Sequence, residues 1–271
     1  MRGSLVALAV LLTLAAACAR KPSAALTLSG STSIQPLAEK WVEAYRVGHD
    51  ALTIAVQGGG STAGVQAILS GTAQIGMVSR ALSPEERRQV HEIVVARDAI
   101  AIVVHPTNPV GDLSLDDVRD LYTGAIGNWR ALGGPARPVS LITREEGSGT
   151  RTAFEGSVMR GQTIAPGALV QDSTGAVRQM VGSDPAAIGY ISLGLVDRSV
   201  KALRLNGVPP TEQSVDDASY ALTRPFLFAL RGEPSRAAAQ FIQWIHGPEG
   251  TALTRAEGFL PPLSEPAHAR Q

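Results

Sequence analysis

Short apolar runs alternate with amphipathic segments along almost the whole chain. Residues 25–29, 52–56 and 100–104 are mostly apolar and lead into glycine, hydroxyl residues or proline, which is typical of β-strands. The segment after the first run places its apolar side chains at helical spacing, at Ile34, Leu37, Ala38, Trp41, Val42 and Tyr45. This order of strand, polar loop and helix recurs further along the chain, so the pattern predicts an α/β fold with largely parallel sheets.

Two strongly apolar runs, at residues 100–104 and 226–230, indicate how the fold divides. A chain that passes from one lobe to a second lobe and back needs two crossing strands. We therefore predict a first lobe from residues 25–102 together with 224–265, a second lobe from residues 103–223, and a tail at 266–271.

The N-terminus has the pattern of an export signal. Residues 5–17 are 13 consecutive residues without a charge and mostly apolar, too few to span a bilayer but suitable for a signal peptide. The run ends at Cys18, the only cysteine, which cannot form an intramolecular disulfide. Small residues before Cys18 resemble a bacterial lipobox, although Ala15 stands where a larger aliphatic residue is usual. We predict a signal peptide at 1–17, a lipidated N-terminus and tether at 18–24, and an exported lipoprotein in the periplasm or at the cell surface. The alternative is an ordinary secretory signal with a bystander cysteine.

Composition limits the class of ligand. The chain has 271 residues, of which 44% are hydrophobic and 18% charged, and its formal net charge at pH 7 is +0. This composition is typical of a folded globular protein and lacks the basic footprint expected of a nucleic-acid-binding one. Local groups, and not the overall field, would therefore have to attract an anionic ligand.

Three loops share one chemistry. Residues 30–33 (GSTS), 58–62 (GGGST) and 147–150 (GSGT) each follow a predicted strand and precede a predicted helix, and residues 172–175 (DSTG) are a fourth case. The first backbone N–H groups of a helix have no intrahelical partner, and the helix dipole is positive there. Glycine lets the backbone approach a ligand closely. Together the loops predict an oxyanion site, although a serine or threonine before a helix also serves as a plain N-cap.

Arg144 strengthens this prediction. It ends a predicted strand, and its guanidinium could donate two hydrogen bonds to one oxyanion. Glu146, two residues further on, is expected to hold the guanidinium in place. The alternative for Arg144 is a surface salt bridge.

Competing chemistries lack their motifs. Residues 147–151 contain no lysine and are too few for a nucleotide-binding P-loop, and neither Ser61 nor Ser148 lies in a G-x-S-x-G elbow. The five histidines show no metal-binding spacing. We expect no metal, no cofactor and no enzymatic activity, with a catalytic base distant in the sequence left as an open alternative.

Four segments together resemble one known family. LSGSTSIQPLAEKW, VQGGGSTAGVQAILSGTAQIGMVSRALSPEE, TREEGSGTRTAFE and AIGYISLGLVD are similar to the phosphate-binding proteins of phosphate-specific ABC transporters, in the order of that family's shorter branch, over residues 26–262. The resemblance implies a type II periplasmic-binding-protein fold: two α/β lobes joined by two hinge crossings, with a ligand cleft between them. It also implies inorganic phosphate as ligand and permease subunits as partners, and we expect a monomer.

The resemblance also assigns roles to residues. Those implied to bind phosphate are Thr32, Ser33, Ser61, Arg144, Ser148, Gly149 and Thr150, with Glu146 as the tether of the arginine. Longer members of the family carry an aspartate that accepts the proton of hydrogen phosphate. Ser79 stands at that position here, followed by Arg80, and Asp98 is a candidate substitute acceptor. This departure keeps two alternatives open: another oxyanion such as sulfate or molybdate, or a phosphate-sensing surface lipoprotein.

Overall fold

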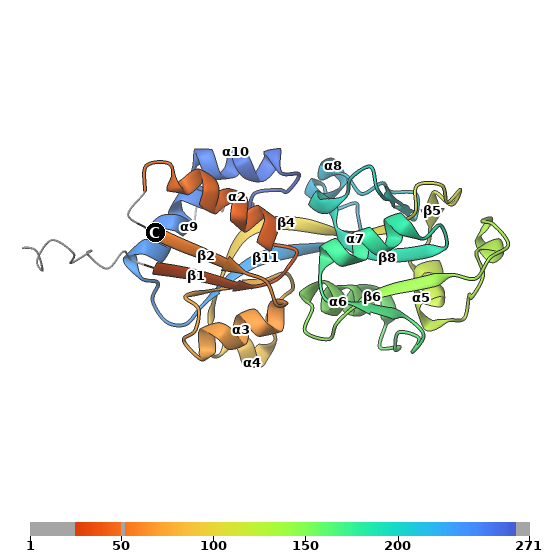
Figure 1. Ribbon diagram of the computed structural model, residues 1–271, viewed down its shortest axis with the longest axis horizontal. Coiled ribbons are helices and arrows are strands. Elements are labelled where there is room, and N and C mark those ends of the chain that lie inside the picture. The colour runs from red at the N-terminus through yellow and green to blue at the C-terminus, as the bar shows by residue number, and fades with distance from the viewer. Residues whose placement is uncertain (1–24, 50–51, 264–271) are drawn as a thin grey trace, which may run out of the picture.

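Two lobes lie side by side in the computed structural model, and two long strands run between them (Figure 1). The structure describes residues 25–49 and 52–263. The predicted signal peptide, Cys18 and the tail at 266–271 lie outside the described residues. Within the described part of the chain, no helix is long and apolar enough to cross a membrane.

The first lobe opens with three strands that each lead into a helix. Its elements are β1 (Ala25–Gly30), α2 (Gln35–Arg46), β2 (Thr53–Gln57), α3 (Ser61–Leu69), β3 (Ile75–Val78) and α4 (Pro84–Arg87). The long strand β4 (His91–Val104) then leaves this lobe, and β11 (Thr223–Leu230) returns to it, followed by α9 (Arg236–His246) and α10 (Pro248–Ala256).

The second lobe is formed by the chain between the two crossings. It contains β5 (Asp112–Leu113), α5 (Leu115–Thr123), the 3-10 helix η2 (Trp129–Leu132), β6 (Ser140–Arg144), α6 (Gly149–Phe154), the π-helix η3 (Glu155–Met159), β7 (Leu169–Gln171), α7 (Thr174–Ser183), β8 (Ala187–Ser192), the 3-10 helix η4 (Leu193–Leu195), β9 (Lys201–Ala202), β10 (Arg204–Leu205) and α8 (Glu212–Asp216).

The main sheet is continuous through both lobes, in the order β2-β1-β3-β11-β4-β8-β6-β7, with β9 beside β4. Strands β2, β1 and β3 are parallel, as are β8, β6 and β7. The prediction of largely parallel sheets is wrong for the crossing strands, because β11 runs antiparallel to β3 and β4, and β4 antiparallel to β8. One crossing strand leaves the first lobe and the other returns to it, so the two must run in opposite directions.

The crossing strands are apolar because both of their faces are covered. In β4, Ile100, Ile102 and Val104 pack into one core cluster of the second lobe, while Ala101 and Val103 pack into another on the opposite face. Strands buried on both faces read as continuous hydrophobic runs instead of alternating ones. This burial explains the apolar run at residues 100–104. Strand β4 pairs with β11 up to Ala99 and with β8 from Ile100 onward.

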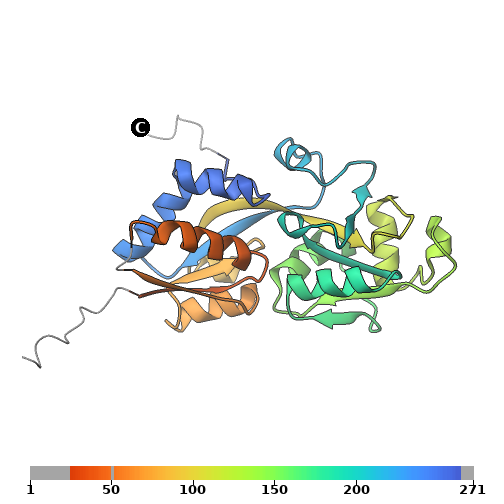
Figure 2. The same ribbon diagram turned by 45° about the horizontal axis from the view of Figure 1, so that its top comes forward.

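Helices cover both faces of the first-lobe sheet (Figure 2). The apolar side of α2 packs with α9 against β1 and β11, and Trp41 meets Phe228 edge to face at 6.0 Å between ring centroids. Helix α3 covers the other face through Val65 and Ile68. Because the helices fix both sides of the sheet, the carboxyl ends of β1, β2 and β3 are held at one edge, facing the second lobe.

Helix starts follow the sequence signals. Ser83 and Glu86 form a capping box, in which each side chain accepts a hydrogen bond from the other residue's backbone N–H. Ser114 and Asp117 form a second capping box at the start of α5. In the second lobe, β6 and β7 end opposite the strand ends of the first lobe, where the Thr62 backbone N–H donates to the Gly147 carbonyl at 3.1 Å.

Candidate oxyanion-binding site

The loop after β1 is held by its own hydroxyl groups. The backbone N–H of Ser31 donates to the Met77 carbonyl at 2.9 Å, which ties the loop to the neighbouring strand. The Ser31 hydroxyl accepts from the Ser33 backbone N–H at 3.2 Å and donates to the Ser79 hydroxyl at 2.8 Å. Ser31, Ser33 and Ser79 are all buried, so these polar groups depend on one another for partners.

The loop after β2 places Ser61 at the first turn of α3. Gly60 has φ 89°, a left-handed conformation that favours glycine, and a Cβ atom there would lie 2.8 Å from the Gly147 carbonyl oxygen of the other lobe. The Ser61 hydroxyl is fully buried and accepts from the Ser79 backbone N–H at 3.0 Å. The glycine run therefore allows the two lobes to approach and brings Ser61 next to Ser79.

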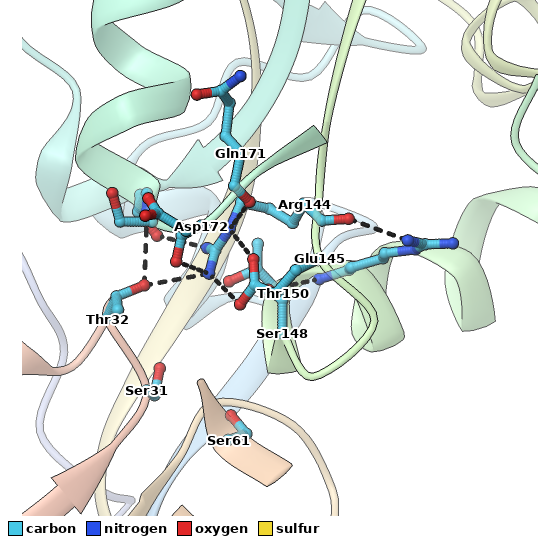
Figure 3. Close-up of polar contacts among 12 residues, drawn as sticks. Ser31, Thr32, Ser61, Arg144, Glu145, Ser148, Thr150, Gln171 and Asp172 are labelled. Carbon is cyan, nitrogen blue, oxygen red and sulfur yellow. Dashed lines mark hydrogen bonds and ion pairs between the residues drawn. The ribbon is translucent and has the colours of Figure 1, made fainter. Parts of the chain in front are cut away.

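Arg144 lies at the end of β6, and its guanidinium is almost completely buried between the lobes (Figure 3). Its Nη1 donates to the Thr174 hydroxyl at 3.0 Å, and its Nη2 donates to the Thr32 hydroxyl of the first lobe at 3.1 Å. The backbone of Arg144 is fixed by Tyr190, whose hydroxyl accepts a hydrogen bond from the Arg144 backbone N–H at 3.3 Å. Burial raises the pKa of Tyr190 to about 12, so its hydroxyl stays protonated at neutral pH.

The carboxylate that holds Arg144 is Glu145, which corrects the prediction of Glu146. Both Glu145 oxygens accept from the guanidinium, Oε2 from Nε at 2.9 Å and Oε1 from Nη2 at 2.8 Å (Figure 3). Glu146 is exposed. The chain turns directly after the strand, with the Ser148 N–H donating to the Glu145 carbonyl, and this turn directs the first glutamate and not the second to the arginine.

The start of α6 brings the second lobe against the serines of the first. Ser148 is the N-cap, and its hydroxyl accepts from the Arg151 backbone N–H at 3.2 Å. Gly149 follows, and a Cβ atom there would lie 2.7 Å from the Ser79 hydroxyl and closer still to that of Ser61. Glycine at this position is therefore required for the two loops to meet.

Three hydroxyl groups form a row across the contact between the two lobes. Ser33 of the first lobe lies between Thr150, at 2.8 Å, and Thr174, at 2.9 Å, both from the second lobe. Thr174 was not among the predicted site residues, although its loop at 172–175 carried the same pattern of hydroxyl residues before a helix. Ser31 was missed too, and its position in GSTS was the available signal.

Arg80 is buried but is directed to its own loop. It forms two hydrogen bonds of 2.7 Å with the Glu86 carboxylate at the start of α4, and these bonds hold the pKa of Glu86 below its ordinary value. The described contacts thus give the Arg80 guanidinium a role in fixing the loop after β3.

Asp98 lies on β4 and pairs with Arg224 on β11, a residue that the sequence analysis missed. Arg224 Nε and Nη2 both donate to Asp98 Oδ2, at 2.9 and 2.8 Å. Burial raises the pKa of Asp98, and the adjacent guanidinium opposes this rise. The sequence carried a signal for this pair, because each crossing strand contains a charged residue beside its apolar run. Burial of such a residue requires a partner.

Taken together, the site is rich in hydrogen-bond donors and draws them from both lobes. The predicted residues Thr32, Ser33, Ser61, Ser79, Arg144, Ser148, Gly149 and Thr150 come together where the two lobes meet, whereas Arg80 binds Glu86 and Glu146 is exposed. Two of the nearby carboxylates, Glu145 and Asp98, are already paired with arginines. Among the described residues, no group of three or more histidine, cysteine, aspartate or glutamate side chains could hold a metal ion. Such an arrangement suits a small oxyanion, which accepts hydrogen bonds on all sides.

Known proteins share this architecture. A family model described as a PBP superfamily domain matches residues 16–249. The phosphate-binding protein PstS of Bacillus subtilis is 30% identical over 248 residues, which covers 89% of this chain and 82% of that relative. A crystal structure with bound phosphate from Clostridium perfringens, assigned as a phosphate ABC transporter substrate-binding protein, has a TM-score of 0.85 and 36% identity, and the match covers 88% of this chain and 99% of that one. An ABC-type phosphate transport receptor from Vibrio cholerae has a TM-score of 0.73 and 35% identity, with 88% and 100% covered.

Proposed function

We propose a function from the premise that this chain belongs to the PBP superfamily and, within it, to the PstS phosphate-binding proteins. The proposed function is the capture of inorganic phosphate between the two lobes for an ABC transporter. The residues support this function independently of the family. Capture and release of the anion require no covalent bond to form or break, so a binding role is sufficient to explain the site.

One observation carries the proposal: the buried Arg144 guanidinium is surrounded by hydroxyl groups from both lobes. Thr32 of the first lobe and Thr174 of the second both accept from it. Arg144 is only 1% exposed, and a guanidinium is rarely buried this deeply without anionic partners. Glu145 supplies one such partner at the side, and a phosphate ion would supply another inside the cleft.

The same contacts explain how binding would close the protein. Donors on both lobes converge on one small volume, so an anion bound there is stabilised by both lobes only when the cleft is closed. The hinge would lie in β4 and β11, the two strands that cross between the lobes. Release to a transporter then requires the lobes to separate.

Ser79 bears on which oxyanion is preferred. Its hydroxyl accepts from Ser31 at 2.8 Å and lies 3.4 Å from the Ser61 hydroxyl. A hydroxyl oxygen has two lone pairs, so Ser79 could also accept the proton of hydrogen phosphate. It could equally donate to sulfate, which has no proton at neutral pH. Sulfate is therefore the second candidate ligand.

Calorimetric titration tests the proposal directly. The protein starting at Ala19 is unfolded and refolded to remove bound anions, and phosphate and then sulfate are titrated into it. We expect one phosphate per chain with a Kd of about 1 μM or tighter. A Kd of about 1 μM corresponds to a binding free energy of about −8 kcal/mol. Equal binding of sulfate would show that the site accepts oxyanions in general and is not selective for phosphate. Absence of binding of either anion would refute the proposed function.

We propose further that the protein is a monomer that works outside the cytoplasm, tethered by a lipid on Cys18, and delivers phosphate to permease subunits. The predicted signal at 1–17 and the family membership support this location. Cys18→Ala is expected to move the protein from the membrane fraction to the soluble fraction of cells that express the full chain. Retention of Cys18→Ala in the membrane fraction would argue against the lipid tether.

A further inference from the structure

A buried ion pair joins the two crossing strands beside the candidate site. Asp98 of β4 and Arg224 of β11 are direct neighbours in the antiparallel register, and they are only 3% and 5% exposed. One carboxylate oxygen, Oδ2, accepts from both Nε and Nη2 of the guanidinium. This geometry fixes the orientation of Arg224 and leaves its third nitrogen, Nη1, directed away from Asp98.

That third nitrogen reaches the candidate site. Nη1 of Arg224 donates to the Thr150 hydroxyl at 2.8 Å and to the Ser79 carbonyl at 3.2 Å. Thr150 belongs to the second lobe and Ser79 to the first, so one guanidinium contacts the loops of both lobes. The Thr150 hydroxyl oxygen therefore already accepts one hydrogen bond from a group that can only donate.

The row Thr150–Ser33–Thr174 ends at an arginine on both sides. Arg224 donates to Thr150 at one end, and Arg144 donates to Thr174 at the other. The two links within the row use two of the three hydroxyl hydrogens. One hydrogen is left over, and because neither arginine can accept it, it must be donated to a group outside the row.

We propose that Arg224 is a positioning residue of the anion site: held by Asp98, it orients the Thr150 hydroxyl so that the row donates its remaining hydrogen to the bound oxyanion. The inference rests on the proposed function and deepens it. Without the Arg224 donor, a lone pair of Thr150 becomes free, and the Thr150 hydroxyl can turn so that it no longer faces the anion as a donor. Arg224 thus acts on the ligand through Thr150.

A double-mutant cycle on phosphate affinity tests this role. Arg224→Met alone would leave the Asp98 carboxylate unpaired in a buried position and could prevent folding. The cycle therefore uses Asp98→Asn/Arg224→Gln, which replaces the ion pair with two neutral amides and shortens the side chain that reaches Thr150. Thr150→Val, which removes the hydroxyl and keeps the shape, is measured in the unsubstituted protein and in this background.

We expect Thr150→Val to weaken phosphate binding by about tenfold in the unsubstituted protein, and by less than about threefold in the Asp98→Asn/Arg224→Gln background. Thr32→Val is the matched control, because Thr32 accepts from Arg144 and makes no contact with Arg224 among the described bonds. It should weaken binding by the same factor in both backgrounds. If the Asp98–Arg224 pair only stabilised the fold, Thr150→Val and Thr32→Val would each weaken phosphate binding by the same factor in both backgrounds.

The outcomes separate the inference from the function it rests on. Phosphate binding with equal effects of Thr150→Val in the two backgrounds would overturn the role of Arg224 and leave the proposed function standing. Absence of phosphate binding by the unsubstituted protein would overturn both. Arg224→Lys adds a second readout, because lysine retains a cationic donor. Thr150→Val should weaken phosphate binding by a larger factor in the Arg224→Lys background than in the Asp98→Asn/Arg224→Gln background.

Discussion

Arg144→Ala is expected to weaken phosphate binding by at least about 100-fold. The guanidinium is buried, and hydrogen bonds to charged groups contribute about 1.5–3 kcal/mol each, so loss of two of them gives this factor. The substitution would also leave the Glu145 carboxylate without its partner at the edge of the site, where its charge repels an anion. Calorimetric titration of phosphate into the variant measures the effect.

Arg204→Ala is the matched control, because this arginine also lies in the second lobe but its side chain is 59% exposed. We expect its phosphate affinity to equal that of the unsubstituted protein. Arg144→Ala/Glu145→Gln separates the two causes, and we expect it to recover at most about tenfold of the loss, since a partly exposed carboxylate is screened by solvent. If Arg144→Ala bound phosphate as tightly as the unsubstituted protein, Arg144 would not be part of the site.

Gly149→Ala is expected to prevent closure and to weaken phosphate binding by about 100-fold or more. A Cβ atom at this position would overlap the Ser61 and Ser79 hydroxyls of the opposite lobe, and both serines are buried and cannot move aside freely. The lobes would then stay far enough apart to break several hydrogen bonds to the anion, each of which contributes about 1.5–3 kcal/mol. Small-angle scattering with and without phosphate should show no phosphate-induced compaction in the variant.

Gly175→Ala is the control for this prediction. Gly175 lies in the first turn of α7, as Gly149 does in α6, but a Cβ atom there meets no neighbouring atom within 4 Å. Both variants should unfold at about the same temperature without phosphate, because the overlap at Gly149 exists only in the closed state. Phosphate-induced compaction of Gly149→Ala would show that the loops yield and that the contact does not limit closure.

The alternation of elements could be predicted because it depends on local physics. Apolar residues at helical spacing gave α2. The apolar run at 100–104 correctly indicated a strand, and the structure shows that both faces of this strand are covered. The direction of the crossing strands did not follow, because hydrophobic periodicity is the same for parallel and antiparallel neighbours.

The choice between Glu145 and Glu146 shows where local reasoning stops. Both residues follow the strand that ends at Arg144, and both are chemically able to hold a guanidinium. Which of them faces Arg144 depends on the backbone dihedrals of one turn, and the sequence pattern does not specify these. The structure places Glu145 against the arginine and leaves Glu146 exposed.

The sequence by itself determined the elements, the hydroxyl-rich loops at the strand ends and the family, because each of these is encoded in neighbouring residues or in motifs of fixed order. Only the tertiary structure decided which distant groups meet: Ser33 with Thr150, and Asp98 with Arg224, which are 117 and 126 positions apart. These pairs arise from the register of two crossing strands and the approach of two lobes. Such long-range geometry is set by the packing of the whole chain, and no short stretch of sequence carries it.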